Sequence, residues 1–238
     1  MKYRFGFLLL LMLLIVSSCA GQDASPKVTS RLKLEDSAKA RLKEGLTIDR
    51  EKPFVEEWKR KAALERKIVD DYGFEGIQLL FEERNSQNYF KLGSFPKDCP
   101  WISLNELSIQ AAIEQDFEPI KDKVPHLVDA LKERCEFIYA EKVNSGWYLH
   151  YFLGMKLYDG QPYYKVYSGG EPNANSQANA SLQKFNWTIP NDLKDFYAVH
   201  DGFGDLSDIG YLMSSDEIVV KGEMMNPIAK QEGIVPEG

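Results

Sequence analysis

Three closely spaced carboxylates, Asp201, Asp205 and Asp208, have the chemistry to bind a cation or a basic partner. An EF-hand calcium loop alternates its ligands and places a glycine at the sixth position, and this spacing does neither. We therefore expect no metal here. The prediction is that these acids lie exposed around a turn and contact a protein partner. The alternative is that they serve only turn formation and solubility.

The three histidines of the chain, His126, His150 and His200, belong to no catalytic motif. The sequence contains no HExxH, GxSxG, P-loop or GxGxxG pattern. His200 is adjacent to Asp201, but neighbouring residues on a helix point apart and no nucleophile is evident beside them. His150 is expected to be a packed imidazole among strand aromatics, and His126 an exposed side chain in a first helical turn. We therefore expect no catalytic residues and no cofactor.

Two cysteines, Cys99 and Cys135, follow the N-terminal region. Export would place them where a disulfide can persist, and a single bridge between them is one possibility. The alternative is two buried free thiols, because the Cα separation that decides between these states cannot be read from sequence. A zinc site is not expected, since no CxxC occurs and the histidines lie far apart.

The N-terminus has the features of an export signal. Lys2 and Arg4 precede a twelve-residue apolar run, Phe5–Val16. A membrane-spanning helix needs about 20 apolar residues. The run is therefore too short to span a bilayer and is typical of a signal-peptide core.

The residues that end this run, Val16–Cys19, resemble the lipobox of bacterial lipoproteins, an aliphatic residue and two small ones before a cysteine. The resemblance implies that a diacylglyceryl group is attached to the Cys19 thiol and that residues 1–18 are removed. Two or three acyl chains, palmitate among them, anchor a protein durably. Ala20 stands where an aspartate would resemble an inner-membrane retention signal, which favours the outer membrane in a two-membrane bacterium. The alternative is an ordinary signal peptide with an incidental cysteine.

The charge of the chain excludes one class of partner. The net charge of all 238 residues is −7, and loss of Lys2 and Arg4 with the signal peptide makes it −9. Nucleic acid is therefore not an expected partner, because binding to phosphates needs basic side chains. The remaining 220 residues are enough for one large or two small domains. No small-molecule substrate is evident.

Apolar periodicity predicts an α+β fold whose first part is rich in helices. Residues 20–50 are polar and small and are expected to form a tether. The elements expected after it are a helix from Pro53 to Tyr72, a strand Ile77–Glu83, a helix Ser103–Phe117 and a helix from His126 to Cys135. The apolar residues expected on one face of the first helix, toward the core, are Phe54, Trp58, Ala62, Ile68, Val69 and Tyr72. Ser103 is the expected N-cap of the second, because Ser-Leu-Asn-Glu has capping-box spacing.

The second half of the chain begins with an expected hairpin between Trp147 and Tyr167, since both arms are rich in aromatic and β-branched residues. Asp159-Gly160 supplies the positive-φ turn between the arms. A loop is expected over Gly169–Ser181. A helix is then expected from Pro190 to about Asp201, with Gly202 as the residue that ends it. Its buried face is formed by Leu193, Phe196, Tyr197 and His200.

The order of residues in this last helix and turn resembles the SUKH superfamily, the domain of Smi/Knr cell-wall regulators and of many bacterial immunity proteins. The resemblance covers about 35 residues, roughly Trp187 to Val220. The residues that carry it are Ile189-Pro190, Asp192, Leu193, Phe196-Tyr197, His200-Asp201-Gly202, and the following Gly210–Met213 and Ser214–Ile218.

The resemblance implies protein binding by direct contact rather than catalysis, and it completes the expected organisation of the chain. The expected segments are a signal peptide over 1–18, a tether over 19–50, a helix-rich α+β region over 51–143 and a SUKH-like mixed helix and sheet region over 144–238. The expected function is that of an envelope lipoprotein that binds a protein, such as a toxin. The alternatives are a structural or assembly lipoprotein and, less favoured, an envelope hydrolase with dispersed catalytic residues.

Overall fold

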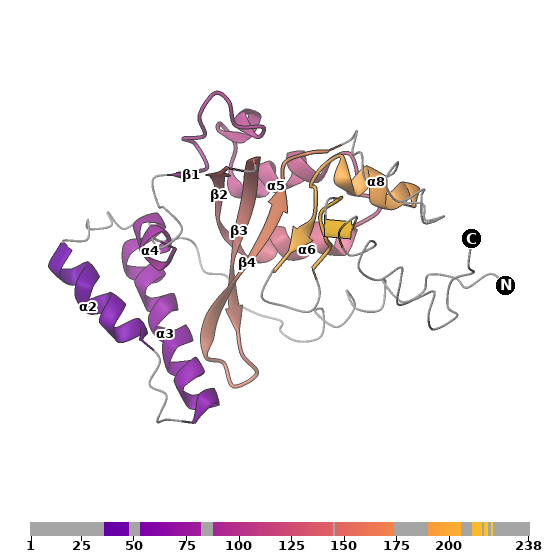
Figure 1. Cartoon of the computed structure of the whole chain (residues 1–238). Helices are drawn as coiled ribbons and strands as arrows, with labels where there is room; N and C mark the ends of the chain where they lie inside the picture. Colours follow the sequence, from indigo (N-terminus) through magenta and orange to yellow (C-terminus); the bar gives the residue numbers. More distant parts are fainter. Residues whose placement is uncertain are drawn as a thin grey trace.

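The fold is an antiparallel sheet with helices on both faces, as the computed structural model shows (Figure 1). The described residues are 36–47, 53–81, 88–144, 146–173, 190–205, 211–215, 217–218 and 220. The helices are α2 Asp36–Leu46, α3 Phe54–Tyr72, α4 Phe74–Leu80, the 3-10 helix η4 Ile102–Leu104, α5 Ile109–Phe117, α6 Pro125–Arg134 and α8 Asn191–Tyr197. The strands are β1 Tyr89–Lys91, β2 Cys135–Val143, β3 Gly146–Lys156, β4 Pro162–Gly170 and β5 Phe203–Gly204. The predicted α+β class is confirmed.

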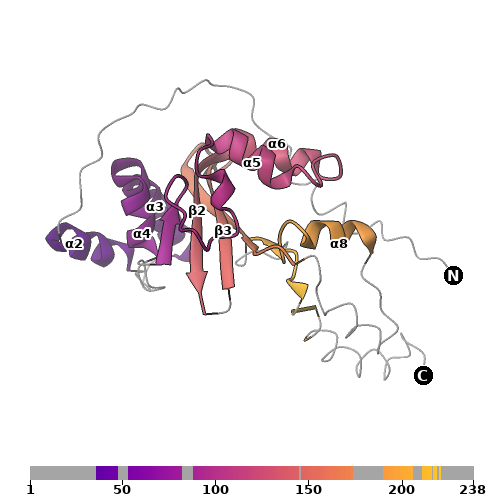
Figure 2. The ribbon, with the colours of Figure 1, turned by 90° about the horizontal axis from the view of Figure 1, so that it is seen from above.

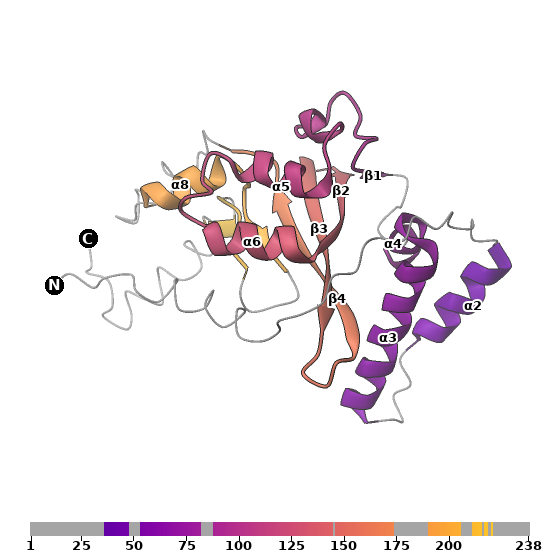
Figure 3. The same ribbon diagram turned by 180° about the vertical axis from the view of Figure 1, so that it is seen from behind.

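The sheet has the strand order β1-β2-β3-β4-β5, and every neighbouring pair is antiparallel. Side chains of successive strand residues point to opposite faces, so β3 serves two cores. Leu149 and Tyr151 enter the larger core, together with side chains from α5, α6 and α8. Phe152 enters the smaller core, where it meets side chains from α3 and α4. The sheet therefore separates two helical layers (Figures 2 and 3).

The hairpin predicted between Trp147 and Tyr167 is confirmed. Strand β4 pairs over its whole length with residues 148–156 of β3, with Tyr151 opposite Tyr167. Gly160 has a φ of 84° in the connecting turn, as the Asp159-Gly160 pair predicts. Because β2 also pairs with β3, the expected boundary at 143/144 falls between two paired strands. Regions 51–143 and 144–238 therefore share one sheet.

The strand predicted over Ile77–Glu83 is wrong, since residues 74–80 form helix α4. A short apolar run fits either a buried strand or a buried helix, and periodicity alone does not separate them. The tertiary contact decides it: Gly76 lies so close to α3 that an added Cβ would come within 2.6 Å of the Ile68 carbonyl oxygen. Helix α4 therefore packs tightly against α3 and buries Ile77 and Leu79.

The predicted start of the next helix at Ser103 is also wrong. Helix α5 begins at Ile109, and its N-cap is Ser108, whose hydroxyl accepts a hydrogen bond from the Ala111 N–H. Ser103 lies in η4, and its hydroxyl accepts a hydrogen bond from the Gln115 side chain. The end of the helix at Phe117 is as predicted.

The last helix follows the prediction more closely. Helix α8 covers Asn191–Tyr197, and the His200 N–H still donates to the Phe196 carbonyl in helical register. Gly202 then adopts a φ of 84°, as expected for the residue after the helix. In the part of the chain that the structure describes, no helix is long and apolar enough to cross a membrane.

Candidate functional site

The predicted exposure of Asp201 is wrong, because its carboxylate is used inside the molecule. It accepts hydrogen bonds from the Ser215 N–H at 2.7 Å, from the Ser215 hydroxyl at 2.8 Å and from the Asn173 side chain at 3.1 Å. These bonds hold the chain around Ser215 against the loop after β4. Asp201 is therefore an organising residue of the turn, and its carboxylate has little capacity left for a partner.

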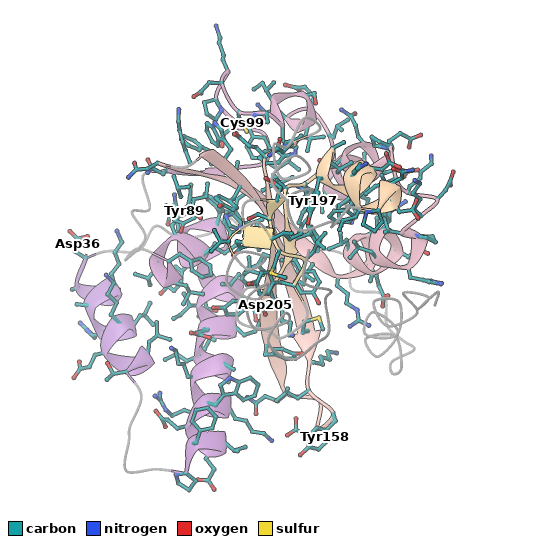
Figure 4. All side chains as sticks on the ribbon, turned by 45° about the vertical axis from the view of Figure 1, so that its right-hand side comes forward. Asp36, Tyr89, Cys99, Tyr158, Tyr197 and Asp205 are labelled. Carbon is teal, nitrogen blue, oxygen red and sulfur yellow. The ribbon has the colours of Figure 1, made fainter. Side chains whose placement is uncertain are left out.

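The other predicted binding residues give no assembled acidic surface. The Asp205 side chain is largely buried, and its carboxylate lies 4.0 Å from the Lys165 ammonium. Figure 4 shows Asp205 beside the sheet. Asp208 lies outside the described residues, as do Cys19 and the rest of the predicted signal peptide and lipidation site.

The two downstream cysteines are both free and buried. The Cys135 thiol donates to the Phe137 carbonyl at 3.2 Å. Burial raises the pKa of Cys135 to about 12 and raises the pKa of Cys99 above its ordinary value. Of the two alternatives left open by the sequence, the structure has the buried free thiols.

Slow modification of Cys135 in the folded protein is therefore expected. With a pKa of about 12 in place of 9.0, the thiolate fraction at pH 8 falls about 1,000-fold, and the thiolate is the reacting species. Alkylation by iodoacetamide, followed by mass spectrometry of residues 20–238, should be at least that much slower in buffer than in urea. In urea without reductant, both thiols should react. Recovery of neither thiol would show a disulfide instead.

A buried network lies around His200, in the larger core. The His200 Nε2 is 2.7 Å from the Asp116 carboxylate and 3.1 Å from the Tyr151 hydroxyl, which itself donates to Asp116. The His200 Nδ1 donates to the Gly170 carbonyl at 3.3 Å. Burial and then the Asp116 charge raise the pKa of Tyr151 well above its ordinary value. The network therefore joins α5, β3 and the end of α8 through polar groups.

A second polar row crosses the opposite face of the sheet. His150 on β3 lies 2.7 Å from the Ser168 hydroxyl through Nδ1 and 3.0 Å from the Glu141 carboxylate through Nε2. A serine hydrolase has the reverse arrangement, with Nε2 facing the serine and Nδ1 facing the acid. The ring is also buried and stacked on Tyr139, with 4.7 Å between ring centroids. His150 is therefore a packed imidazole, as predicted, and we assign it no catalytic role.

Two surfaces remain as candidate binding sites, and the first is a groove beside α5. It has a volume of about 360 Å³ and is lined by Leu107, Ala111, Glu114, Gln115 and Glu118. Leu107 and Ala111 are partly buried, whereas the two glutamates are exposed. Each glutamate is paired with a lysine, Glu114 with Lys132 at 2.9 Å and Glu118 with Lys121 at 2.7 Å. We call this surface the α5 groove.

The second surface, which we call the aromatic end, consists of Phe54, Val55, Trp58 and Tyr158. Their exposed fractions are 76%, 62%, 41% and 97%. The placement of Phe54 and Trp58 on a buried face is therefore wrong. The helix has the expected period, but its first turn extends beyond the edge of the sheet that covers the rest of the helix (Figure 1).

Several contacts join the two parts of the aromatic end. The Lys59 ammonium forms an ion pair with Asp159 and lies 5.6 Å from the centre of the Tyr158 ring. The Gln161 side chain donates to the Lys59 carbonyl at 2.7 Å. Trp58 packs on Tyr163 with 6.2 Å between ring centroids. The hairpin turn and the start of α3 therefore form one surface, with Tyr158 at its tip (Figure 4).

Comparisons with protein-family models, with curated proteins and with solved structures gave no match. The SUKH resemblance therefore remains a prediction from the residues that carry it. Among the described residues, no group of three or more histidine, cysteine or acidic side chains is placed to hold a metal ion.

Proposed function

We propose that this chain is a lipoprotein of the bacterial cell envelope, anchored by lipid on Cys19, whose folded body binds a protein partner. An immunity-type protein that captures a toxin in the envelope is the form of this function that the SUKH resemblance favours. The Val16–Cys19 segment supports the anchor. The α5 groove is the observation that supports protein binding.

The chemistry of the α5 groove suits a basic partner with an apolar contact residue. Leu107 and Ala111 offer an apolar floor, and Glu114 and Glu118 stand exposed at the rim. Their ion pairs with lysines are surface pairs, which are worth at most about 1 kcal/mol each and exchange easily for a partner's cations. The net charge of the chain without its signal peptide, −9, would further accelerate the approach of a basic protein.

The anchor is tested on the full-length chain expressed in a two-membrane bacterium. We expect mass spectrometry to find an N-terminus at Cys19 that carries a diacylglyceryl group, and the protein to sediment with membranes. The Cys19→Ser chain should lack the lipid. An unmodified N-terminus at any other residue would exclude the lipoprotein assignment.

Partner binding is tested by affinity capture from envelope extracts with residues 20–238, which contain every described element. Neutralising the groove rim with Glu114→Gln and Glu118→Gln is expected to weaken capture of a saturable basic protein about tenfold, or about 1.4 kcal/mol. The matched control, Glu44→Gln with Asp71→Asn, changes the net charge equally on the other helical layer and should bind like the original chain. Equal losses in both double variants would mean that net charge, and not the groove, attracts the partner.

A further inference from the structure

The aromatic end is a protruding tip built from two elements far apart in the sequence. The first turn of α3 and the turn between β3 and β4 extend together beyond the rest of the sheet (Figures 1 and 3). Phe54 and Tyr158 are the most exposed large apolar side chains that the structure describes. The exposed side chains of this tip are therefore contributed jointly by the helix start and by the hairpin turn.

The residue types at this tip are those of a membrane interface. Tryptophan and tyrosine concentrate at the level of the lipid headgroups, where the ring is apolar and the polar atom remains wet. Phe54 and Val55 add side chains that gain free energy on leaving water. Trp58 lies one helical turn after Phe54, so the two rings project from the same side of α3.

The cations at positions 59–61, near the tip, are already paired within the protein. Lys59 is paired with Asp159, Arg60 with Glu57 at 2.5 Å, and Lys61 with Glu65 at 3.7 Å. These cations therefore need no anionic lipid, whereas the Glu56 carboxylate, exposed in the first turn of α3, must stay on the water side when the rings insert. The attraction depends on apolar area and not on anionic lipid, which distinguishes the aromatic end from a polybasic surface.

The proposed anchor would bring this tip within reach of a bilayer. Sixteen residues separate Cys19 from the first residue of α2, Asp36, and at about 3.6 Å per residue the upper limit of the reach of sixteen residues is about 58 Å. A body of this size, with a radius of gyration of about 17 Å, can therefore turn any of its surfaces toward the membrane. A lipid anchor also keeps the tip at a high effective concentration, so weak insertion suffices.

We infer that the aromatic end inserts into the interfacial layer of a phospholipid bilayer and orients the anchored body on it. This inference rests on the proposed lipid anchor for its biological setting, but the insertion itself is a property of the folded body. Helix α5, which supplies most of the lining of the α5 groove, lies on the other side of the sheet from α3 (Figure 2). A body held by its aromatic end would therefore leave the groove open to a partner.

The test uses residues 20–238, without lipid, and vesicles of phosphatidylcholine alone or with phosphatidylglycerol. The original chain is expected to sediment with both kinds of vesicle. Phe54→Ser with Tyr158→Ser should lower the partition coefficient at least tenfold, since burial of one phenylalanine side chain accounts for more than that factor. The matched control is Ile102→Ser, which removes an apolar side chain that is 39% exposed on η4 and should leave the partition coefficient unchanged.

Trp58 supplies a second readout, because the double variant retains it. In the lipidated full-length protein reconstituted into vesicles with brominated acyl chains, quenching of Trp58 is expected, and it should disappear with Trp58→Phe. Absence of vesicle binding by residues 20–238, or equal losses in the double variant and in Ile102→Ser, would overturn the inference. So would loss of partner capture in the double variant with vesicle binding unchanged. Failure of the anchor is separate and is read from the mass of the N-terminus.

Discussion

Replacing His200 with alanine is expected to lower the free energy of unfolding by about 3–5 kcal/mol. The ring is fully buried, and its Nε2 lies 2.7 Å from the buried Asp116 carboxylate. Removing the ring leaves that carboxylate in the core with the Tyr151 hydroxyl as its remaining partner, and loss of one partner of a buried polar pair is strongly destabilising. The space vacated among Phe117, Trp101 and Phe203 adds a cavity cost.

Urea unfolding of residues 20–238, followed by far-UV circular dichroism, measures this loss. Tyr151→Phe should cost less, about 1–3 kcal/mol, since it removes one hydrogen bond to Asp116 and keeps the contact of Asp116 with His200. His126→Ala is the matched control at an exposed histidine, and it should change the free energy of unfolding by less than about 0.5 kcal/mol. If His200→Ala cost no more than His126→Ala, the network would contribute nothing to the fold.

The elements that the sequence predicts correctly are those with strong local chemistry. The β3–β4 hairpin follows from two aromatic arms and the Asp159-Gly160 turn, and α8 follows from a proline start and the glycine at 202. In each case the backbone conformation is set by residues within a few positions. No distant contact is needed to choose it.

The wrong predictions occur where a distant contact decides between local alternatives. Residues 77–80 are helical because Gly76 lets α4 approach α3. Helix α5 begins at Ile109 with Ser108 as its N-cap, although Ser103 has the better local capping pattern, because η4 occupies residues 102–104. Whether Phe54 is buried depends on where the sheet beneath α3 ends, and periodicity carries no information on that edge.

The candidate site was less predictable than the fold. Asp116 and His200 are 84 residues apart, so no local sequence motif predicts their contact. The acids around Asp201 were singled out by composition, but the hydrogen-bonding capacity of an aspartate near a turn is often used by the turn itself. The aromatic end could not be predicted from the sequence for the same reason, since Tyr158 and Phe54 are brought together only by the packing of the hairpin on α3.

Replacing Gly202 with alanine is expected to lower the free energy of unfolding by about 2–5 kcal/mol. A positive φ costs a residue with a Cβ about 1–2 kcal/mol, and Gly202 has a φ of 84°. The added Cβ would also lie 2.9 Å from the Ser214 nitrogen and 3.1 Å from the Leu212 carbonyl oxygen, both backbone atoms. Relieving such contacts in a packed region costs about 1–3 kcal/mol more.

Gly160 separates the two contributions, because it has the same φ of 84° but no atom within 4 Å of the position of a Cβ. Gly160→Ala should therefore lose only the conformational part, about 1–2 kcal/mol. The difference between the two variants in urea unfolding is the cost of pushing Leu212–Ser214 away from the turn. If Gly202→Ala lowered the free energy of unfolding no more than Gly160→Ala, residues 212–214 could move away from the added Cβ without an energetic cost. The turn would then not hold that segment in place. A clearly larger loss of unfolding free energy in Gly202→Ala than in Gly160→Ala would mean that the turn needs a glycine for two reasons, its positive φ and its close packing. The residue types of the His-Asp-Gly turn indicate only the first of these reasons.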